Sequence, residues 1–284
     1  MFNSKSINDR LKNYALEHGI KDVEKARIAL CLERVIARLV QDNFLYEHLI
    51  FGGGFVLYKE TNSNRYTRDV DAVISGIGKD ELILKVNENL NVDLNDGFWF
   101  GNPIIEQLKT ESGYGGLRFK IQYKAGLPYP IDSELKKLRR VHLDISIGVN
   151  LEKIAKVSSM NSTLDIYDQV EWKVYPIEFI CAEKIHCLLM RKDLNTRGKD
   201  VYDLDFLLDK SDQGAFIDAL KLTFKNRDYQ VLNSFESIIK SIDSKSLEQS
   251  FNKSQFKSAS NNFTKCWANI VLKLQDFDRF FSSK

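Results

Sequence analysis

The sequence lacks a long hydrophobic run and a recognisable targeting segment. No stretch of its 284 residues approaches the roughly 20 apolar residues that a helix needs to span a bilayer. The first residues, Met1 to Lys5, are not part of an apolar segment of the kind found in secretory signals. We therefore expect a cytoplasmic protein with no membrane partner.

Cysteine and histidine are scarce, with four residues of each. No two cysteines form a Cys-x-x-Cys pair, and the histidines do not have the spacing of zinc ligands. We therefore expect neither a disulfide framework nor a structural zinc site.

The sequence also has no large excess of charge of one sign. Its 41 Lys and Arg residues face 39 Asp and Glu residues, for a net charge of +2. A surface built for non-specific nucleic-acid binding is normally more basic than this. Positive charge is local instead, in one cluster over 136–140 and in a second run over 184–199.

The hydrophobic fraction of 43% is sufficient for one large domain or two modest ones. Helical periodicity runs from about Ile7 to Asp42, and the sequence is again helical from Pro176 onward, with a break near 195–198. Strands are expected at 49–51, 69–73, 98–100, 117–123 and 141–149. The pattern predicts an α/β (α+β) fold with a mixed sheet and a helical C-terminal region, divided into residues 1–165 and 166–284.

The strongest chemical signal is a glycine pair, Gly53 and Gly54, followed by Asp69 and Asp71. Residues two apart on a strand face the same side of the sheet, so the two carboxylates repel unless a cation lies between them. A pair of Mg²⁺ ions meets that need, and such ions act in phosphoryl transfer. Glycines let the backbone approach a phosphate closely, at a helix start whose N–H groups point toward it.

A third acid, Asp144, lies on another predicted strand between the apolar residues Leu143 and Ile145. Its side chain should face away from theirs. If this strand pairs beside the strand of Asp69, Asp144 can join the same metal site. For Asp69 and Asp71, the alternative is that they are ordinary solvent-exposed strand acids.

Lys184 lies on the apolar face of its predicted helix, between Ile180 and Leu188. A lysine is rarely buried without an anionic partner. We expect a triphosphate there first, in which case Lys184→Met should preserve stability, and a salt bridge to a carboxylate such as Asp200 second. Asp200 itself could equally be a helix N-terminal acid stabilised by the helix dipole, and Asp203 could serve only to fix Arg197.

Four sequence blocks in this order resemble the AbiEii/AbiGii toxin family of polymerase-β-like nucleotidyltransferases. They are the glycine pair, the string from Arg65 through Thr67 to Asp71, the stretch from Tyr175 to Lys184, and the segment from Arg197 to Leu204. The resemblance covers roughly residues 45 to 210. This sequence departs from the family pattern by having Gly52 before the glycine pair and Phe55 after it, where the family often has a basic and a small hydroxyl residue.

The resemblance implies a polymerase-β-type palm that, with Mg²⁺, transfers a nucleoside monophosphate from an NTP to an acceptor hydroxyl. Asp69, Asp71 and Asp144 are then the metal ligands and catalytic acids, and Asp200 joins the active site. The triphosphate is bound at Gly53 and Gly54, with Lys184 as the neutralising cation. Arg65 and Thr67 shape the turn before the metal strand.

The resemblance further implies the toxin of a toxin–antitoxin or abortive-infection pair, with a cognate antitoxin protein as partner. RNA, specifically the 3′ end of tRNA, is the first-choice acceptor. One alternative is transfer of the nucleotide to a protein or a small molecule. Another is a non-catalytic palm that only binds nucleotide or RNA.

Overall fold

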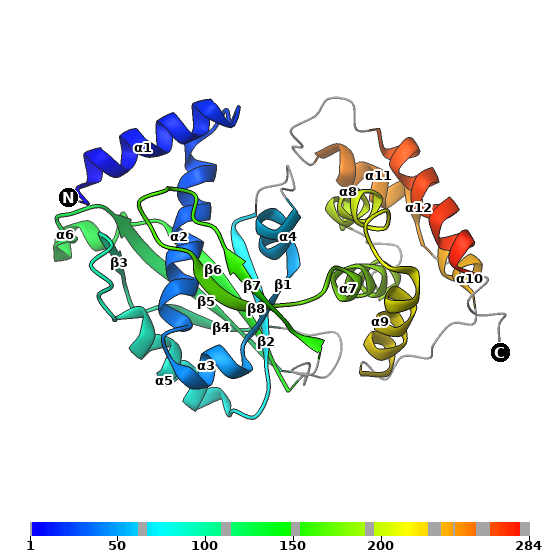
Figure 1. Cartoon of the computed structure of the whole chain (residues 1–284), viewed down its shortest axis with the longest axis horizontal. Helices are drawn as coiled ribbons and strands as arrows, with labels where there is room; N and C mark the ends of the chain where they lie inside the picture. The colour runs from blue at the N-terminus through cyan, green and yellow to red at the C-terminus, as the bar shows by residue number, and fades with distance from the viewer. Residues whose placement is uncertain are drawn as a thin grey trace. The chain divides into compact units, whose positions relative to one another are not determined.

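The structure is a computed structural model that describes residues 2–61, 67–108, 115–148, 154–190, 196–226, 234–240, 242–253 and 262–278. These residues form two compact units, the first ending at Tyr175 and the second beginning at Pro176 (Figure 1). Within the described ranges, no helix has the length and apolar character needed to cross a membrane.

Three helices open the first unit: α1 (Ser4–Glu17), α2 (Val23–Leu39) and α3 (Asn43–His48). The predicted helical span is therefore interrupted after α1. Gly19 adopts a φ of +62°, a backbone conformation that residues other than glycine rarely adopt. The side chain of Asp22 then accepts a hydrogen bond from the amide of Glu24 and begins α2.

A mixed eight-stranded sheet forms the body of the first unit. Its strands are β1 (Ile50–Gly52), β2 (Asp69–Ile74), β3 (Phe98–Phe100), β4 (Ile104–Leu108), β5 (Gly116–Ala125), β6 (Arg140–Ile147), β7 (Lys156–Met160) and β8 (Val170–Val174). The order is β3-β5-β6-β2-β1-β8-β7, with β4 also paired to β5. Pairs β2·β6 and β1·β8 are parallel, and the other pairs are antiparallel.

This sheet confirms the predicted mixed α+β fold class, and strands were expected at β1, β2, β3, β5 and β6. Strands β4, β7 and β8 were not predicted. Strand β8 pairs in parallel with β1, so it belongs to the sheet of the first unit although it lies beyond the expected division after residue 165.

The other helices of this unit are α4 (Gly53–Thr61), α5 (Lys79–Leu90) and α6 (Asp132–Leu135). Helix α4 packs on β1 and β2, whereas α2 contacts α5 and β6. Phe55 of α4 meets the fully buried Trp172 of β8 edge-on, and Phe51 of β1 packs on the same indole. This aromatic contact fixes α4 against the strands from which it emerges.

The second unit is helical, as expected. Its helices are α7 (Ile177–Met190), α8 (Gly198–Leu207), α9 (Gln213–Asn226), α10 (Phe235–Lys240), α11 (Ser244–Lys253) and α12 (Phe263–Phe277). Helix α7 packs on α8 and α9, and α8 also packs on α11 and α12. Phe216, Phe235 and Phe277 form a buried aromatic cluster, so these C-terminal aromatic residues serve the core.

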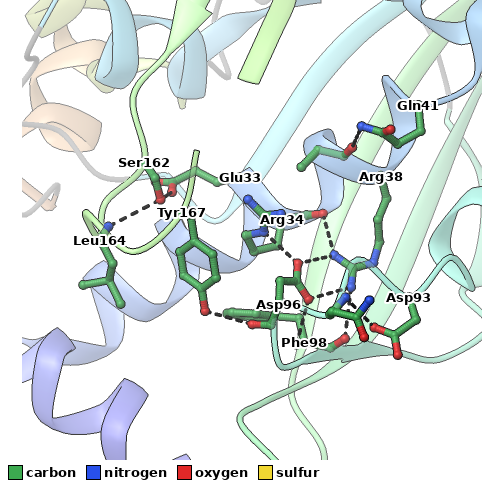
Figure 2. A network of polar contacts seen from close by, with 12 residues as sticks. Glu33, Arg34, Arg38, Gln41, Asp93, Asp96, Phe98, Ser162, Leu164 and Tyr167 are labelled. Atoms are coloured by element: carbon green, nitrogen blue, oxygen red, sulfur yellow. Dashed lines mark hydrogen bonds and ion pairs between the residues drawn. The ribbon is translucent and has the colours of Figure 1, made fainter. Parts of the chain in front are cut away.

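A buried ionic network ties α2 to the sheet (Figure 2). Both Nη atoms of Arg38 donate to the Asp96 carboxylate at 2.8 and 2.9 Å, and Arg34 Nε donates to it at 2.8 Å. Arg38 also donates to the carbonyl of Phe98 at 3.0 Å, and the Tyr167 hydroxyl donates to the Asp96 carbonyl. Two cations therefore share one buried carboxylate.

Glu33, also on α2, anchors helix α4, which begins with the glycine pair. Its carboxylate forms an ion pair with Lys59 of α4 and accepts hydrogen bonds from the amide of Thr163 at 2.8 Å and the hydroxyl of Ser162 at 2.9 Å. Because α4 begins at Gly53, this contact helps to fix the position of the glycine turn.

We expect Asp96→Asn to lower the free energy of unfolding by about 3–5 kcal/mol, because it leaves two buried guanidinium groups without their counter-charge. Chemical denaturation followed by circular dichroism measures this change. Asp165→Asn is the control, since Asp165 contacts Arg10 at an exposed position and should change stability by less than about 0.5 kcal/mol.

The same carboxylate predicts a pH dependence. Burial acts to raise the pKa of Asp96, but hydrogen bonds and charge from Arg38, the Phe98 amide and Arg34 outweigh it and leave the pKa below its ordinary value. The stabilisation is thus present above the unfolded pKa of about 3.9 and is lost as pH falls through the folded pKa. Equal stability of wild type and Asp96→Asn at neutral pH would contradict this account.

Candidate active site

The predicted carboxylates lie on two neighbouring parallel strands. Strand β2 pairs with β6 in a register that places Asp71 beside Asp144 and Asp69 beside His142. Val70 and Leu143 are fully buried, so the acids on either side of them face the other side of the sheet. The condition under which Asp144 could join the site, a pairing of its strand with the strand of Asp69, is met.

Thr67 supports the first of these acids. Its hydroxyl donates to the Asp69 side chain, and the Asp69 amide donates back to the same hydroxyl at 3.4 Å. This short loop of contacts fits the predicted role of Thr67 in shaping the turn before β2. Arg65, its predicted companion, lies outside the described residues.

The glycine turn lies directly against the second acid. Gly52 is paired with Asp71 across β1 and β2, and Gly53 adopts a φ of +68°. A Cβ atom at Gly53 would overlap Asp71 Oδ2 and lie 2.8 Å from its Cγ. Gly53 must therefore lack a side chain for two reasons, its backbone conformation and the space that Asp71 occupies. Gly54 follows in the first turn of α4.

The two departures from the family pattern have packing reasons. A Cβ atom at Gly52 would overlap the aromatic ring of Tyr175, so no basic side chain fits there. Phe55 is buried in the core, where its ring contacts Trp172. It therefore does not lie at the solvent-exposed side of the glycine turn.

Arg118 was not predicted from the sequence, yet it is the partner of the third acid. It lies on β5 in register with Asp144, and its Nε and Nη2 atoms donate to Asp144 Oδ1 at 2.8 Å and Oδ2 at 2.6 Å. Its hydrogen bonds to Asp144, and the charges of that residue, Asp69 and Asp71, raise the pKa of Arg118. The available signal was the alternation of β5, which buries Leu117 and Phe119 and turns Arg118 to the opposite face.

His142 is the register partner of Asp69. Burial and the positive charge of Arg118 lower its pKa below the ordinary value, against the raising effects of Asp144 and Asp69. Arg118 contacts Asp144 directly, and the charges of Asp69 and Asp71 also act on its guanidinium.

Carboxylate oxygens are the donors that hard divalent cations prefer, so Asp69, Asp71 and Asp144 fit such an ion in donor type and in strand register. As placed, however, no three His, Cys, Asp or Glu side chains in the described ranges are grouped to hold one ion. Both Asp144 oxygens instead accept hydrogen bonds from Arg118.

Lys184 lies in the second unit, on α7, where it is 5% exposed. Its Nζ donates to Asp200 Oδ1 at 2.8 Å and to Asp203 Oδ2 at 2.7 Å, and both carboxylates are buried. Arg197 donates to the other oxygen of Asp200. The carboxylate alternative considered for Lys184 is thus present in the structure, and a contact between Lys184 and a triphosphate stays a prediction.

Asp203 therefore does more than the sequence suggested, because it shares the buried ammonium group of Lys184. Arg197 forms an ion pair with Asp200, three residues further along the chain. The structure thus brings Gly53, Thr67 and the three acids together in the first unit, and Lys184 with Asp200 in the second.

The sequence matches the family described as nucleotidyl transferase AbiEii toxin, type IV TA system, over residues 34–283. The chain belongs to this AbiEii nucleotidyltransferase toxin family, whose members use an NTP and a divalent metal and pair with an antitoxin.

Two solved structures share the fold. MenT4, a nucleotidyltransferase toxin from Mycobacterium tuberculosis H37Rv, is 15% identical and superposes with a TM-score of 0.60, covering 96% of this chain and 92% of its own. JHP933 from Helicobacter pylori is 17% identical with a TM-score of 0.55, covering 91% of this chain and 94% of its own. No curated protein sequence matches.

We expect Gly53→Ala to abolish nucleotidyl transfer, because the added methyl group must displace the Asp71 carboxylate. Gly19→Ala is a matched control, since Gly19 has a similar φ of +62° but no atom within 4 Å of the added Cβ. Both variants should lose about 1–2 kcal/mol of stability from the left-handed backbone. Only Gly53→Ala should lose activity, and equal activity of the two variants would show that the turn is not part of the site.

We expect Lys184→Met to lower the free energy of unfolding by about 3–5 kcal/mol, because it leaves the buried carboxylate of Asp203 without this cation. This reverses the stability expected if a triphosphate were the sole partner. Lys199→Met, at an exposed position of the neighbouring helix α8, should change stability by less than about 0.5 kcal/mol. Nucleotide-free denaturation of the three proteins measures the effect, and a Lys184→Met variant as stable as wild type would contradict it.

Proposed function

We propose that this toxin transfers a nucleoside monophosphate from an NTP to an acceptor hydroxyl with Mg²⁺, and that the acceptor is RNA, at the 3′ end of tRNA. The observation that carries the proposal is the register of β2 and β6. It places Asp71 and Asp144 side by side next to the glycine turn at Gly53. Two acids and a side-chain-free turn on one edge form a suitable place for a metal-bound triphosphate.

Each residue of the first unit has a proposed task. Asp69 and Asp71 hold the divalent cation, and Thr67 keeps the Asp69 carboxylate oriented through its hydroxyl. Gly53 and Gly54 let the phosphate oxygens approach the start of α4. Asp144 accepts the proton of the attacking hydroxyl and contributes to the nucleophile side of the metal site. When bound, Mg²⁺ supplies the charge that stabilises the attacking and leaving oxygens.

Lys184 and Asp200 are proposed site residues because of their positions in the family-like blocks of the sequence. Lys184 would neutralise the triphosphate, and losing that contact should weaken NTP binding about tenfold to a hundredfold. Asp200 accepts a hydrogen bond from Lys184 at 2.8 Å and a second contact from Arg197, so it fixes the position of the lysine.

RNA is favoured as acceptor over a protein or a small molecule, in keeping with the family resemblance. The basic cluster at 136–140 immediately precedes β6, the strand that carries Asp144, and Lys136 and Lys137 in it are not fully buried. Arg139 in this cluster pairs with Glu24. Phosphate contacts of this type position a nucleic acid without reading its sequence.

The decisive experiment follows the fate of two phosphates. The full chain is incubated with Mg²⁺, total RNA and an NTP labelled at either the α- or the γ-phosphate. Nucleotidyl transfer puts the α-label into the acceptor and releases the γ-label as pyrophosphate. We expect α-label in RNA of tRNA size and none with EDTA. The α-label in protein would instead identify a protein acceptor, and label in neither would favour a non-catalytic palm.

We expect Asp71→Asn to reduce this transfer by about a thousandfold or more, because it removes a metal interaction worth several kcal/mol in the transition state. The variant is nearly isosteric, so its fold should be retained. Asp165→Asn, an exposed acid in the same unit, should transfer at the wild-type rate. Wild-type turnover by Asp71→Asn would rule out the metal-site assignment.

A further inference from the structure

Arg118 supplies a positive charge on the face of the sheet that carries Asp69, Asp71 and Asp144. Its guanidinium contacts both oxygens of Asp144, at 2.8 and 2.6 Å, in a two-pronged arrangement that is among the strongest side-chain contacts. The Asp144 side chain is 12% exposed and that of Arg118 is 33% exposed, so the pair is only partly screened by water.

The neighbouring lysine on the same strand shows that this contact is specific. Lys120 lies two residues further along β5, on the same side as Arg118, and pairs with Glu106 of β4. Arg118 and Lys120 thus contact acids on opposite neighbouring strands. Only Arg118 reaches toward β6 and the acid that stands beside Asp71.

A divalent ion and this guanidinium require the same oxygens. Asp71 and Asp144 are register partners on parallel strands, and an ion shared between them needs at least one oxygen of each. Both oxygens of Asp144 already accept hydrogen bonds from Arg118. Arg118 therefore occupies one acceptor site on each Asp144 oxygen, and its positive charge opposes the binding of a divalent ion there.

We propose that Arg118 is a built-in competitor of the divalent cation at Asp144. It neutralises the third acid when no ion is bound, and an ion held by Asp71 and Asp144 must either displace this guanidinium or bind against its positive charge. Arg118 thereby sets the metal concentration that the site requires. This inference rests on the proposed function, because it takes Asp144 as a metal ligand.

The test measures Mn²⁺ binding to the full chain without nucleotide, by the electron paramagnetic resonance signal of free Mn²⁺. We expect Arg118→Gln to bind Mn²⁺ about tenfold more tightly than wild type, the change that corresponds to one charge-assisted contact. Lys120→Gln removes the same charge from the same face of β5 and should change the affinity by less than about twofold, because Lys120 contacts Glu106.

Two further variants keep the test decisive. In an Asp144→Asn background, Arg118→Gln should no longer change Mn²⁺ affinity, because the oxygens for which it competes are altered. Arg118→Lys keeps the charge but loses the fork. It should bind Mn²⁺ about threefold more tightly than wild type, and it serves if Arg118→Gln does not fold.

Unchanged or weaker Mn²⁺ binding by Arg118→Gln would overturn the inference, as would an equal gain in Lys120→Gln. The proposed function can be refuted independently of this inference. If wild-type Mn²⁺ binding is lost in Asp71→Asn while Arg118→Gln leaves it unchanged, only the competition is refuted. If Mn²⁺ binding does not depend on Asp71 at all, the metal site itself is refuted.

Discussion

The parallel pairing of β2 with β6 forces two like charges, Asp71 and Asp144, to stand side by side. Backbone hydrogen bonds set this register, so the side chains cannot relieve the repulsion by moving apart along the strands. The surroundings of the two acids compensate for it. Gly53 leaves the space that the Asp71 carboxylate needs, and Arg118 places a guanidinium on Asp144. A face that concentrates negative charge in this way is suited to bind a cation.

The rest of the first unit keeps these groups in place. Helix α2 is buried along most of its length. Its Arg38 forms an ion pair with Asp96, and its Glu33 forms an ion pair with Lys59 of α4. The first contact fixes α2 to the entry of β3, and the second fixes the helix that begins at the glycine turn. Buried pairs of this kind contribute little net stability, but breaking one is costly, so they favour one arrangement strongly over its alternatives.

Much of the carboxylate face, formed by Asp69, Asp71 and Asp144, could be predicted from the sequence. The reason is that alternation along a strand indicates which side chains lie on the same face of the sheet. Asp69, Asp71 and Asp144 were identified in this way, and their strands are neighbours. Arg118 could not be found by the same reasoning, since its importance appears only when the register of β5 against β6 is known. The partners of Lys184 were undecided for a similar reason. Burial called for an anion, but the choice between a triphosphate and the carboxylates of α8 depends on how α7 packs on α8. Strand β4 escaped prediction because its residues are largely exposed and do not alternate.

The proposed function requires the acids of β2 and β6 to form the metal centre of nucleotidyl transfer. Anomalous X-ray diffraction from crystals grown with Mn²⁺ and a non-hydrolysable NTP analogue would locate that centre. We expect a manganese peak coordinated by carboxylate oxygens of Asp71 and Asp144, with the guanidinium of Arg118 shifted away from Asp144. A bound nucleotide whose manganese is coordinated by other residues, with the Arg118–Asp144 pair intact, would contradict it.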